Sequence, residues 1–360
     1  MKTLDKPVPP GGTIGIIGGG QLGRMMALAA SRLGLKALIY SDLPDVPAFQ
    51  VTPLQLIAPY DDRATLSALA NVCHAVTFEF ENIPAEAMAF LAERVPVRPN
   101  PAALATTQDR FAEKSFVAAL GLKTAPFFEV SSAEQAREAF GKLTGEGILK
   151  TRRLGYDGKG QMRAVSADDA GLAFAALGGA PCILEGFVEF SFEASVVAAR
   201  GADGCFAAYD PPENVHEHHI LRRSTVPGRL TPAQVDEAKA IARTIADALE
   251  YVGVLAVELF VAKDGGLIVN EIAPRVHNSG HWTIEACACS QFEQHIRAVA
   301  GWPLGNPTRH ADVVMENIIG DEVRAWESLA RSGALHLYGK KEAKPGRKMG
   351  HVTRLAPRSR

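Results

Sequence analysis

The sequence of 360 residues carries almost no net charge and no long apolar run. Lys and Arg number 38 and Asp and Glu number 40, so no overall field attracts nucleic acid or an anionic membrane. No stretch approaches the ~18 consecutive apolar residues of a membrane-spanning helix, and the opening MKTLDKPVPPGG has no apolar signal segment. We therefore expect a cytoplasmic protein with neither a membrane nor a nucleic acid as partner.

Cysteine is also scarce. The five cysteines include no CxxC pair, which argues against a disulfide framework or a structural zinc site. Cys287 and Cys289 stand in an apolar, helix-like stretch, where we expect small buried side chains. The phosphate-binding pattern GxxxxGK[ST] does not occur. An anionic substrate must therefore be held by other local arrangements.

The pattern of strands and helices predicts an α/β protein. Apolar residues make up 47% of the chain, and at roughly 100–200 residues per domain the length indicates two or three domains. Over residues 13–94 strands alternate with helices, which predicts a parallel sheet covered by helices. Residues 95–109, with three prolines, mark the end of this unit. Residues 210–228 read as a polar stretch rich in His and Pro.

A glycine cluster joins the first strand to the first helix. Gly18, Gly20 and Gly23 fit the pattern GxGxxG, and Asp42 follows the next strand, where a ribose-binding acid would stand. Glycines let the backbone approach an anion at a helix N-terminus. The cluster is consistent with a dinucleotide, with a lone sugar phosphate, or with a tight turn that holds no ligand.

A second glycine cluster follows a lysine. Lys150 closes the apolar strand at 147–151 and precedes Gly155, Gly158 and Gly160. A strand-terminal lysine beside a flexible glycine flap suits a triphosphate, because it offers a point charge and a set of backbone N–H groups. The alternative is an exposed basic loop.

Two glutamates are expected to meet across a hairpin. A two-residue turn at Asp264-Gly265 makes Glu258 and Glu271 direct partners on one face, in strands that are otherwise apolar. A divalent cation such as Mg²⁺ resolves the repulsion between such carboxylates. Asn270 points to the opposite face if the strand is regular. The alternative is a solvated face that carries two unrelated acids.

Polar and basic residues follow the hairpin. Arg275, His277, Asn278, Ser279 and His281 crowd together, and an arginine there offers a fork to a carboxylate or a phosphoryl group. The spacing of the two histidines is only weak support for zinc. The tail gathers Lys340, Lys341, Lys344, Arg347 and Lys348, which form either a phosphate clamp or a solvated basic end.

With Lys150, the flap and the acidic pair, residues 106–300 resemble the ATP-grasp ligases. GGGQLGRM, TFEFENIP, NEIAPRVHNSGHWT and PGRKMGH extend the resemblance nearly end to end, to carboxylating members that act on aminoimidazole ribonucleotide. It implies a Rossmann-like preATP-grasp domain over 1–105, an ATP-grasp domain over 106–300 with a central subdomain about 125–190, and a small C-terminal substrate-phosphate domain over 301–360.

The resemblance also implies roles for individual residues. ATP would contact Arg110, Lys150, Gly155, Tyr156, Asp157, Gly158, Lys159, Gly160, Gln161, Glu185, Gly186, Phe187, Val188, Glu193, His216, Asn270 and Glu271. Mg²⁺ would be held by Glu258 and Glu271. The ribonucleotide would contact Gln21, Leu22, Glu81, Tyr156, Asp157, Arg275, Lys340 and Arg347. The catalytic residues would be Lys150, Arg275, His277 and Asn278.

The reaction implied is an ATP-driven N-carboxylation of aminoimidazole ribonucleotide by bicarbonate through carboxyphosphate, in purine biosynthesis, by a homodimer. The glycine turn would then serve a sugar phosphate. Within the family, a formate-using glycinamide ribonucleotide ligase or a biotin-carboxylase-like enzyme are alternatives. An NAD(P)-dependent oxidoreductase built on the glycine turn would leave the flap and the acidic pair without a task. A non-catalytic ATP-binding regulator is disfavoured by the intact acidic pair.

Overall fold

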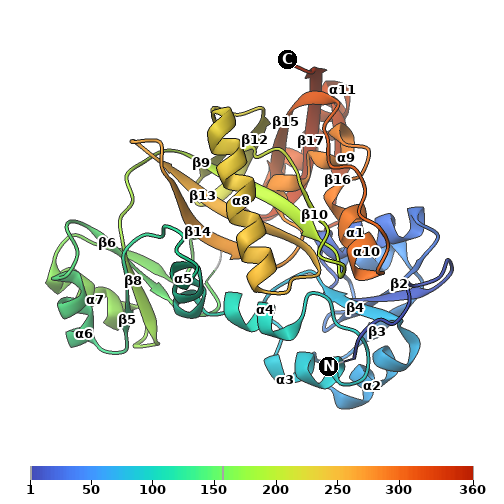
Figure 1. Cartoon of the computed structure of the whole chain (residues 1–360), viewed down its shortest axis with the longest axis horizontal. Coiled ribbons are helices and arrows are strands. Elements are labelled where there is room, and N and C mark those ends of the chain that lie inside the picture. The colour runs from blue at the N-terminus through green and yellow to red at the C-terminus, as the bar shows by residue number, and fades with distance from the viewer. Residues whose placement is uncertain (1, 156–157, 360) are drawn as a thin grey trace.

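Three β-sheets organise the protein in a computed structural model, which describes residues 2–155 and 158–359 (Figure 1). The N-terminal sheet is parallel throughout, in the order β3-β2-β1-β4. Its strands are β1 (Thr13–Ile17), β2 (Lys36–Ser41), β3 (Gln55–Ile57) and β4 (Ala75–Phe78), which alternate with helices α1 (Gln21–Arg32), α2 (Arg63–Val72) and α3 (Ala85–Ala92). The predicted parallel sheet with covering helices is confirmed.

A smaller antiparallel sheet forms a separate lobe, drawn in green in Figure 1. It has the order β5-β8-β6-β7, with strands β5 (Phe127–Val130), β6 (Gly147–Thr151), β7 (Gln161–Ala164) and β8 (Cys182–Gly186). Helices α6 (Ala133–Phe140) and α7 (Ala167–Ala176) pack on it. Leu149 and Leu184 lie in its apolar core. These residues belong to a hydrophobic core distinct from those of the other two sheets.

The largest sheet has nine strands in the order β14-β13-β9-β11-β12-β15-β17-β16, with β10 paired to β9. The strands are β9 (Phe190–Arg200), β10 (Phe206–Ala208), β11 (Glu213–Glu217), β12 (Ile220–Val226), β13 (Gly253–Ala262), β14 (Leu267–Ala273), β15 (Ala311–Ile319), β16 (Ala334–Leu337) and β17 (Lys348–Pro357). Since β12 pairs with β15, the C-terminal strands continue this sheet.

Helices cover both faces of the largest sheet. Since successive side chains of a strand point to opposite faces, neighbouring residues pack under different helices. Val196 in β9 packs in the core under α8 (Pro232–Ala248), while its neighbour Val197 packs in the core under α10 (Gln291–Val299). His295 of α10 ties two sheets together: its Nδ1 accepts from the N–H of Val254 at 3.0 Å, and its Nε2 lies 2.7 Å from Oγ1 of Thr77 in β4. The N-terminal and largest sheets are therefore joined through a buried imidazole.

The hairpin of β11 and β12 lies within residues 210–228, which were predicted to be a polar stretch rich in His and Pro. Its two turn residues, His218 and His219, have φ of 52° and 63°. Left-handed conformations at both positions belong to a type I′ turn, which normally uses Asn and Gly. The ring of His219 lies over the flap, so that a Cβ on Gly158 would come within 2.6 Å of it.

Shorter elements complete the described chain: η1 (Pro47–Val51), α4 (Pro101–Thr107), α5 (Arg110–Ala119), η2 (Asn278–Gly280), α9 (Thr283–Ala286), η3 (Gly320–Ala325) and α11 (Trp326–Ser332). Cys287 and Cys289 are buried as expected, but both lie beyond the end of α9 and not inside a helix. All five cysteines have free thiols.

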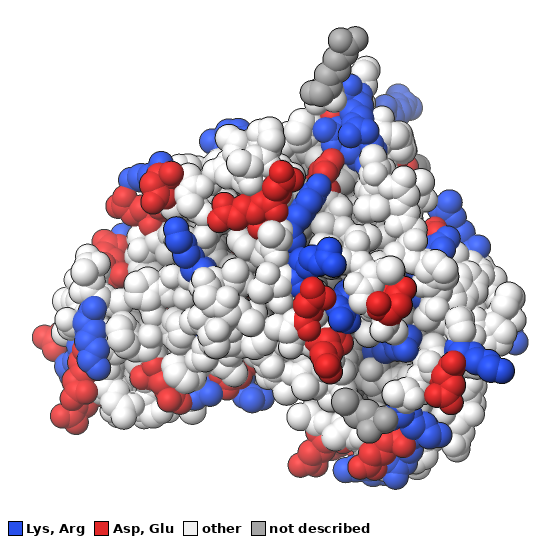
Figure 2. Space-filling model, viewed as in Figure 1, with Lys and Arg blue, Asp and Glu red and all other residues white. Residues whose placement is uncertain are grey.

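Acidic and basic side chains are interspersed over the surface that Figure 2 shows, in keeping with the small net charge. Among residues 2–155 and 158–359, no helix is long and apolar enough to cross a membrane.

Candidate active site

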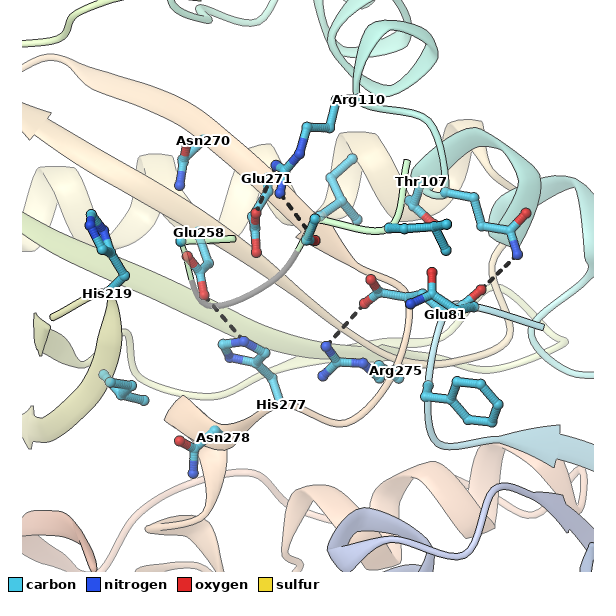
Figure 3. A pocket seen from close by; sticks show the side chains of 18 of the residues that line it. Glu81, Thr107, Arg110, His219, Glu258, Asn270, Glu271, Arg275, His277 and Asn278 are labelled. Carbon is cyan, nitrogen blue, oxygen red and sulfur yellow. Dashed lines mark hydrogen bonds and ion pairs between the residues drawn. The ribbon is translucent and has the colours of Figure 1, made fainter. Parts of the chain in front are cut away.

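A cavity of about 500 Å³ opens where the three sheets meet, and Figure 3 shows it from close by. Most of the residues predicted for the site line it, although they come from distant parts of the chain. They are Gln21, Leu22, Glu81, Arg110, Lys150, Gly155, Gly158, Gln161, Glu193, His216, Glu258, Asn270, Glu271, Arg275, His277 and Asn278. Tyr156 and Asp157, also predicted for the site, lie outside the described residues.

The acidic pair is confirmed as a pair of direct partners, but by a different route from the one expected. Near the turn Val261 pairs with Leu267, where a two-residue loop would pair it with Ile268, so the register is offset by one residue. A register shift next to Glu258 then restores its pairing with Glu271. The shift makes Asn270 the extra residue of the bulge. A bulge re-aims side chains, which explains why Asn270 lines the cavity beside Glu271.

The two carboxylates have opposite environments. Oε1 of Glu258 lies 3.2 Å from Nε2 of His277 (Figure 3). Burial opposes ionisation of Glu258, but the hydrogen bond from His277 and nearby positive charges lower its pKa to about 2. Burial and the charge of Glu258 raise the pKa of Glu271, against the pull of Arg110 at 3.4 Å. Two carboxylates held together in this way fit a hard divalent cation that relieves their repulsion.

Lys150 stands at the base of the flap, where it pairs across β6 and β7 with Gln161. Its Nζ lies 3.0 Å from Oε2 of Glu185, which Lys114 approaches at 3.5 Å. Burial disfavours the charge of Glu185, yet the two lysines lower its pKa to about 2. Burial likewise lowers the pKa of Lys150, although Glu185 opposes this shift. A buried lysine held by one carboxylate in this way is poised to exchange it for a phosphate.

The flap is anchored at both ends. The N–H of Thr151 donates to the carbonyl of Gly160 at 2.8 Å, and Nη2 of Arg110 donates to the carbonyl of Gly155 at 3.4 Å. A Cβ on Gly160 would lie 2.6 Å from Oγ1 of Thr151, so glycine is needed there. Lys159 and Gly160 belong to the flap but not to the described lining of the cavity.

Two further contacts orient polar side chains in the cavity. His216 and Glu193, both predicted for the nucleotide, form a hydrogen-bonded pair. Burial opposes protonation of His216, but the contact with Glu193 raises its pKa. Arg275 forms an ion pair with Glu81 at 3.0 Å, as Figure 3 shows.

The predicted segment after β8 lies away from the cavity lining. Glu185 belongs to the end of that strand, and the N–H groups of Gly186 and Phe187 already donate to the carbonyls of Pro126 and Glu146, each at 2.8 Å. Gly186, Phe187 and Val188 are not among the described residues that line the cavity.

The glycine turn is filled by a side chain of the protein. The N–H groups of Gly20 and Gly23 both donate to the carboxylate of Glu79, the second at 2.6 Å. A Cβ on Gly18 would lie 2.3 Å from Cγ of Glu79. Two of the donors at the start of α1, the N–H groups of Gly20 and Gly23, are therefore taken by an internal carboxylate and are not open to a dinucleotide or a sugar phosphate. This removes the basis of the oxidoreductase alternative.

The basic tail lies beside the cavity. Lys348 lines it, whereas Lys340 and Arg347 are not among the described lining residues. Nζ of Lys340 donates to the carbonyl of Lys348 at 2.7 Å. Its positive charge opposes the rise in the pKa of Glu79 that burial causes.

Three parts of the chain match known domain models. Residues 12–108 match the ribonucleotide synthetase preATP-grasp domain, residues 115–292 the ATP-grasp domain, and residues 313–360 the phosphoribosylaminoimidazole carboxylase C-terminal domain. N5-carboxyaminoimidazole ribonucleotide synthase of Brucella melitensis is 55% identical over 99% of this chain and 100% of its own length. That of Bacillus subtilis is 42% identical over 96% of this chain and 91% of its own. The chain belongs to the N5-carboxyaminoimidazole ribonucleotide synthase family. It is an ATP-grasp ligase.

Solved members of this family share the fold. The Staphylococcus aureus enzyme complexed with ADP has a TM-score of 0.93 and 36% identity, and covers 99% of this chain and 96% of its own. The Aspergillus clavatus enzyme in complex with ADP and 5-aminoimidazole ribonucleotide has a TM-score of 0.90 and 31% identity, and covers 97% and 94%. The expected architecture of a Rossmann-like domain, an ATP-grasp domain and a C-terminal domain is confirmed.

Several residues at the site were not predicted from the sequence. Glu113 and Lys114 follow Arg110 by three and four positions in α5, so all three share one helix face. Oε1 of Glu113 accepts from the N–H of Ile272 at 2.6 Å, and Nζ of Lys114 donates to the carbonyl of Asn270 at 2.7 Å. Three charges on one face would usually mark a solvated surface. The signal available in the sequence was Arg110, a residue already assigned to ATP, which lies on the same helix face as Glu113 and Lys114.

Proposed function

We propose that this protein carboxylates 5-aminoimidazole ribonucleotide at its exocyclic amine, with bicarbonate as the carbon source and ATP as the energy source. The products are N5-carboxyaminoimidazole ribonucleotide, ADP and phosphate. The observation that carries the proposal is the direct pairing of Glu258 and Glu271 in a cavity that also holds Lys150 and Arg275. The complexes of the related enzymes with ADP and with the ribonucleotide support the choice of substrates.

ATP lies between the small lobe and the largest sheet in this proposal. Lys150 and the flap from Gly155 to Gln161 hold the phosphates, together with Arg110 and Asn270. The end of β8, from Glu185 to Val188, offers backbone edges to adenine, and Glu193 with His216 takes the ribose. The positions of Lys150, Arg110 and Glu193 around one cavity support this arrangement.

Glu258 and Glu271 would hold Mg²⁺, because this cation prefers hard oxygen ligands and its charge would relieve the repulsion between the two carboxylates. When bound, the cation neutralises charge on the phosphates of ATP.

The reaction begins when an oxygen of bicarbonate attacks the γ-phosphorus of ATP. The bond to the β–γ bridging oxygen breaks, ADP leaves, and carboxyphosphate remains. Lys150 and Arg275 stabilise the charge that is transferred, since phosphoryl transfer depends mainly on positioning and electrostatics. Carboxyphosphate then breaks its carbon–oxygen bond to give CO₂ and phosphate. The amine nitrogen attacks CO₂ and passes its proton to the phosphate just released, while the flap excludes water.

The ribonucleotide occupies the end of the cavity nearest the N-terminal sheet. Gln21, Leu22 and Glu81 line that end, and Arg275, held by Glu81, stands between the ribonucleotide and the phosphates of ATP. Lys340 and Arg347 bind the phosphate of the ribonucleotide. Tyr156 and Asp157, which lie outside the described residues, are assigned to the same substrate. His277 and Asn278 orient bicarbonate.

We divide the chain into residues 1–105, 106–300 and 301–360, with a central part about 125–190. In this division the first and last parts bind the ribonucleotide and the middle part binds ATP. A cytoplasmic homodimer belongs to the same proposal, and sedimentation velocity at micromolar protein tests the dimer.

The proposal is tested by ADP release from ATP and bicarbonate, with and without 5-aminoimidazole ribonucleotide. We expect the ribonucleotide to stimulate release and ¹³C from labelled bicarbonate to enter the product. Formate with glycinamide ribonucleotide serves as the competing substrate pair. Greater stimulation by that pair, or no incorporation of ¹³C, contradicts the proposal.

A further inference from the structure

A relay of hydrogen-bonded side chains leads from the cavity into the largest sheet. Its members are His277, Ser279, Ser195, Asn214 and Ser224. Nδ1 of His277 lies 2.9 Å from Oγ of Ser279, which lies 2.7 Å from Oγ of Ser195. Oγ of Ser195 lies 2.9 Å from Nδ2 of Asn214, and Oδ1 of Asn214 lies 2.8 Å from Oγ of Ser224. All members except His277 are buried. A hydrogen-bonded chain that is nearly sealed from water must satisfy its own donors and acceptors.

Strand register places this chain beside the acidic pair. Glu258 of β13 is the direct partner of Ser195 in β9, and Asn214 of β11 is the direct partner of Ser224 in β12. Direct partners project from the same face of a sheet. A polar row therefore crosses the cavity-facing side of the sheet, and η2, which carries Ser279, connects it to His277.

The contacts of His277 decide which ring nitrogen carries the proton of its neutral form. The backbone N–H of Ser279 donates to Nδ1 at 3.3 Å, and a backbone amide can only donate. Nε2 faces the carboxylate of Glu258 at 3.2 Å, and an ionised carboxylate can only accept. Both ends of the imidazole thus select the tautomer with hydrogen on Nε2.

The rest of the chain has the same direction. The hydroxyl of Ser279 donates to Nδ1, so its oxygen accepts from the hydroxyl of Ser195. Ser195 in turn accepts from the amide nitrogen of Asn214, which can only donate. Ser224 donates to Oδ1 of Asn214. Each serine between His277 and Asn214 therefore donates once and accepts once, and the amide of Asn214 fixes the order.

We propose that Ser279, Ser195 and Asn214 are positioning residues that hold His277 in the Nε2–H tautomer, so that it acts in the cavity as a hydrogen-bond donor and not as a base. One oxygen of Glu258 is then occupied by His277, and the other is left for a cation. The single N–H of the neutral ring is directed at Glu258, so His277 orients this carboxylate, and the effect on catalysis rests on the proposed function. The proton lost by the amine must leave by another group.

The tautomer can be measured without any substrate. In protein labelled with ¹⁵N-histidine, in alkaline buffer, the signals of His277 are assigned by their loss in His277→Gln. We expect Nε2 of His277 to be protonated and Nδ1 to be bare. A protonated Nδ1 in the wild-type protein would overturn the proposal, whatever reaction the protein catalyses.

The variant Asn214→Asp replaces the fixed donor by an acceptor of the same shape. We expect a larger fraction of the Nδ1–H form, and a fall in kcat for ADP release by about tenfold or more, since a histidine in the wrong tautomer loses its catalytic contact. KM for ATP should change less than about twofold, because the described side-chain hydrogen bonds of Asn214 and Ser195 go to other members of the relay and not to the residues proposed for ATP. Ser195→Ala should act in the same direction.

Ser290→Ala is the matched control, because it removes a hydroxyl that caps α10 through the N–H of Glu293 and has no part in the relay. It should lower thermal stability without moving the ¹⁵N signals of His277. If Asn214→Asp leaves those signals unchanged while it folds, the relay is wrong. If the signals shift but no variant or wild-type protein carboxylates the ribonucleotide, the relay stands and the proposed function fails.

Discussion

The carboxylate of Glu79 accepts a hydrogen bond from the backbone N–H of Gly23, with 2.6 Å between nitrogen and oxygen. The glycine pattern before α1 is therefore explained by a side chain of the protein itself. Gly18 and Gly20 are small because the carboxylate of Glu79 lies against them.

Gly18→Ala tests this relationship. The new Cβ would meet Cγ of Glu79 at 2.3 Å with φ of 107°, so we expect a loss of about 3 kcal/mol in the free energy of unfolding. Gly34→Ala is the control, since Gly34 has φ of 71° but open space around it and should lose about 1 kcal/mol. Urea denaturation followed by circular dichroism measures both. Equal losses would show that the contact with Glu79 is not what requires glycine.

Glu271→Gln removes one charge of the acidic pair. We expect ADP formation to fall by about 100-fold or more, because Mg²⁺ would lose one of its two carboxylate ligands beside the phosphates of ATP. The melting temperature should not fall, since the change relieves repulsion from Glu258. Glu189→Gln, which removes an exposed carboxylate paired with Lys263, should retain normal turnover. A near-normal rate in Glu271→Gln would take Mg²⁺ away from this residue.

Lys340→Ala and Arg347→Ala should each raise KM for the ribonucleotide about tenfold or more while changing KM for ATP little, because each removes a charge from the substrate phosphate. Lys341 is the natural control, as it lies next in sequence but pairs at 2.8 Å with Asp45 on the surface. Steady-state kinetics with each substrate varied in turn distinguishes these effects. A larger change in KM for ATP would show that Lys340 and Arg347 act on ATP and not on the ribonucleotide.

His295 should make the protein sensitive to acid. Burial lowers its pKa from 6.5 to about 3, so between these values the unfolded chain binds a proton that the folded protein does not. The folded protein therefore loses stability as pH falls from 6.5 toward 3, by a few kcal/mol in all. His295→Asn can keep an acceptor for the N–H of Val254 and lacks the titrating ring. Its free energy of unfolding should fall less steeply over this pH range, and an unchanged slope would contradict the assignment.

The features that follow from local pattern were predictable from the sequence. Alternating strands and helices gave the parallel sheet, and the position of the turn was enough to place Glu258 and Glu271 on neighbouring strands near each other. The direct pairing arises from two irregularities that cancel, because the register is offset by one residue at the turn and a bulge at Asn270 restores it. The bulge at Asn270 has no distinct residue pattern.

Two other features depend on tertiary contacts. Nothing near Glu79 in the sequence indicates that it caps a helix whose first residue lies 58 positions earlier, at Gln21. The hairpin at His218 and His219 was missed because its turn uses neither Asn nor Gly, and these residues adopt left-handed conformations against a weak local preference. The flap and the neighbouring sheet provide the surroundings that hold them.

The pairing of β12 with β15 limits how the protein can be divided. If the chain were cut after α10, β12 would become an open edge with unpaired N–H and C=O groups, ready to recruit strands from other molecules. Met315 and Val313, which fill the core beneath it, would be lost at the same time. A truncated version that keeps every residue proposed for ATP should therefore aggregate, so the last strands are as necessary for solubility as for the substrate.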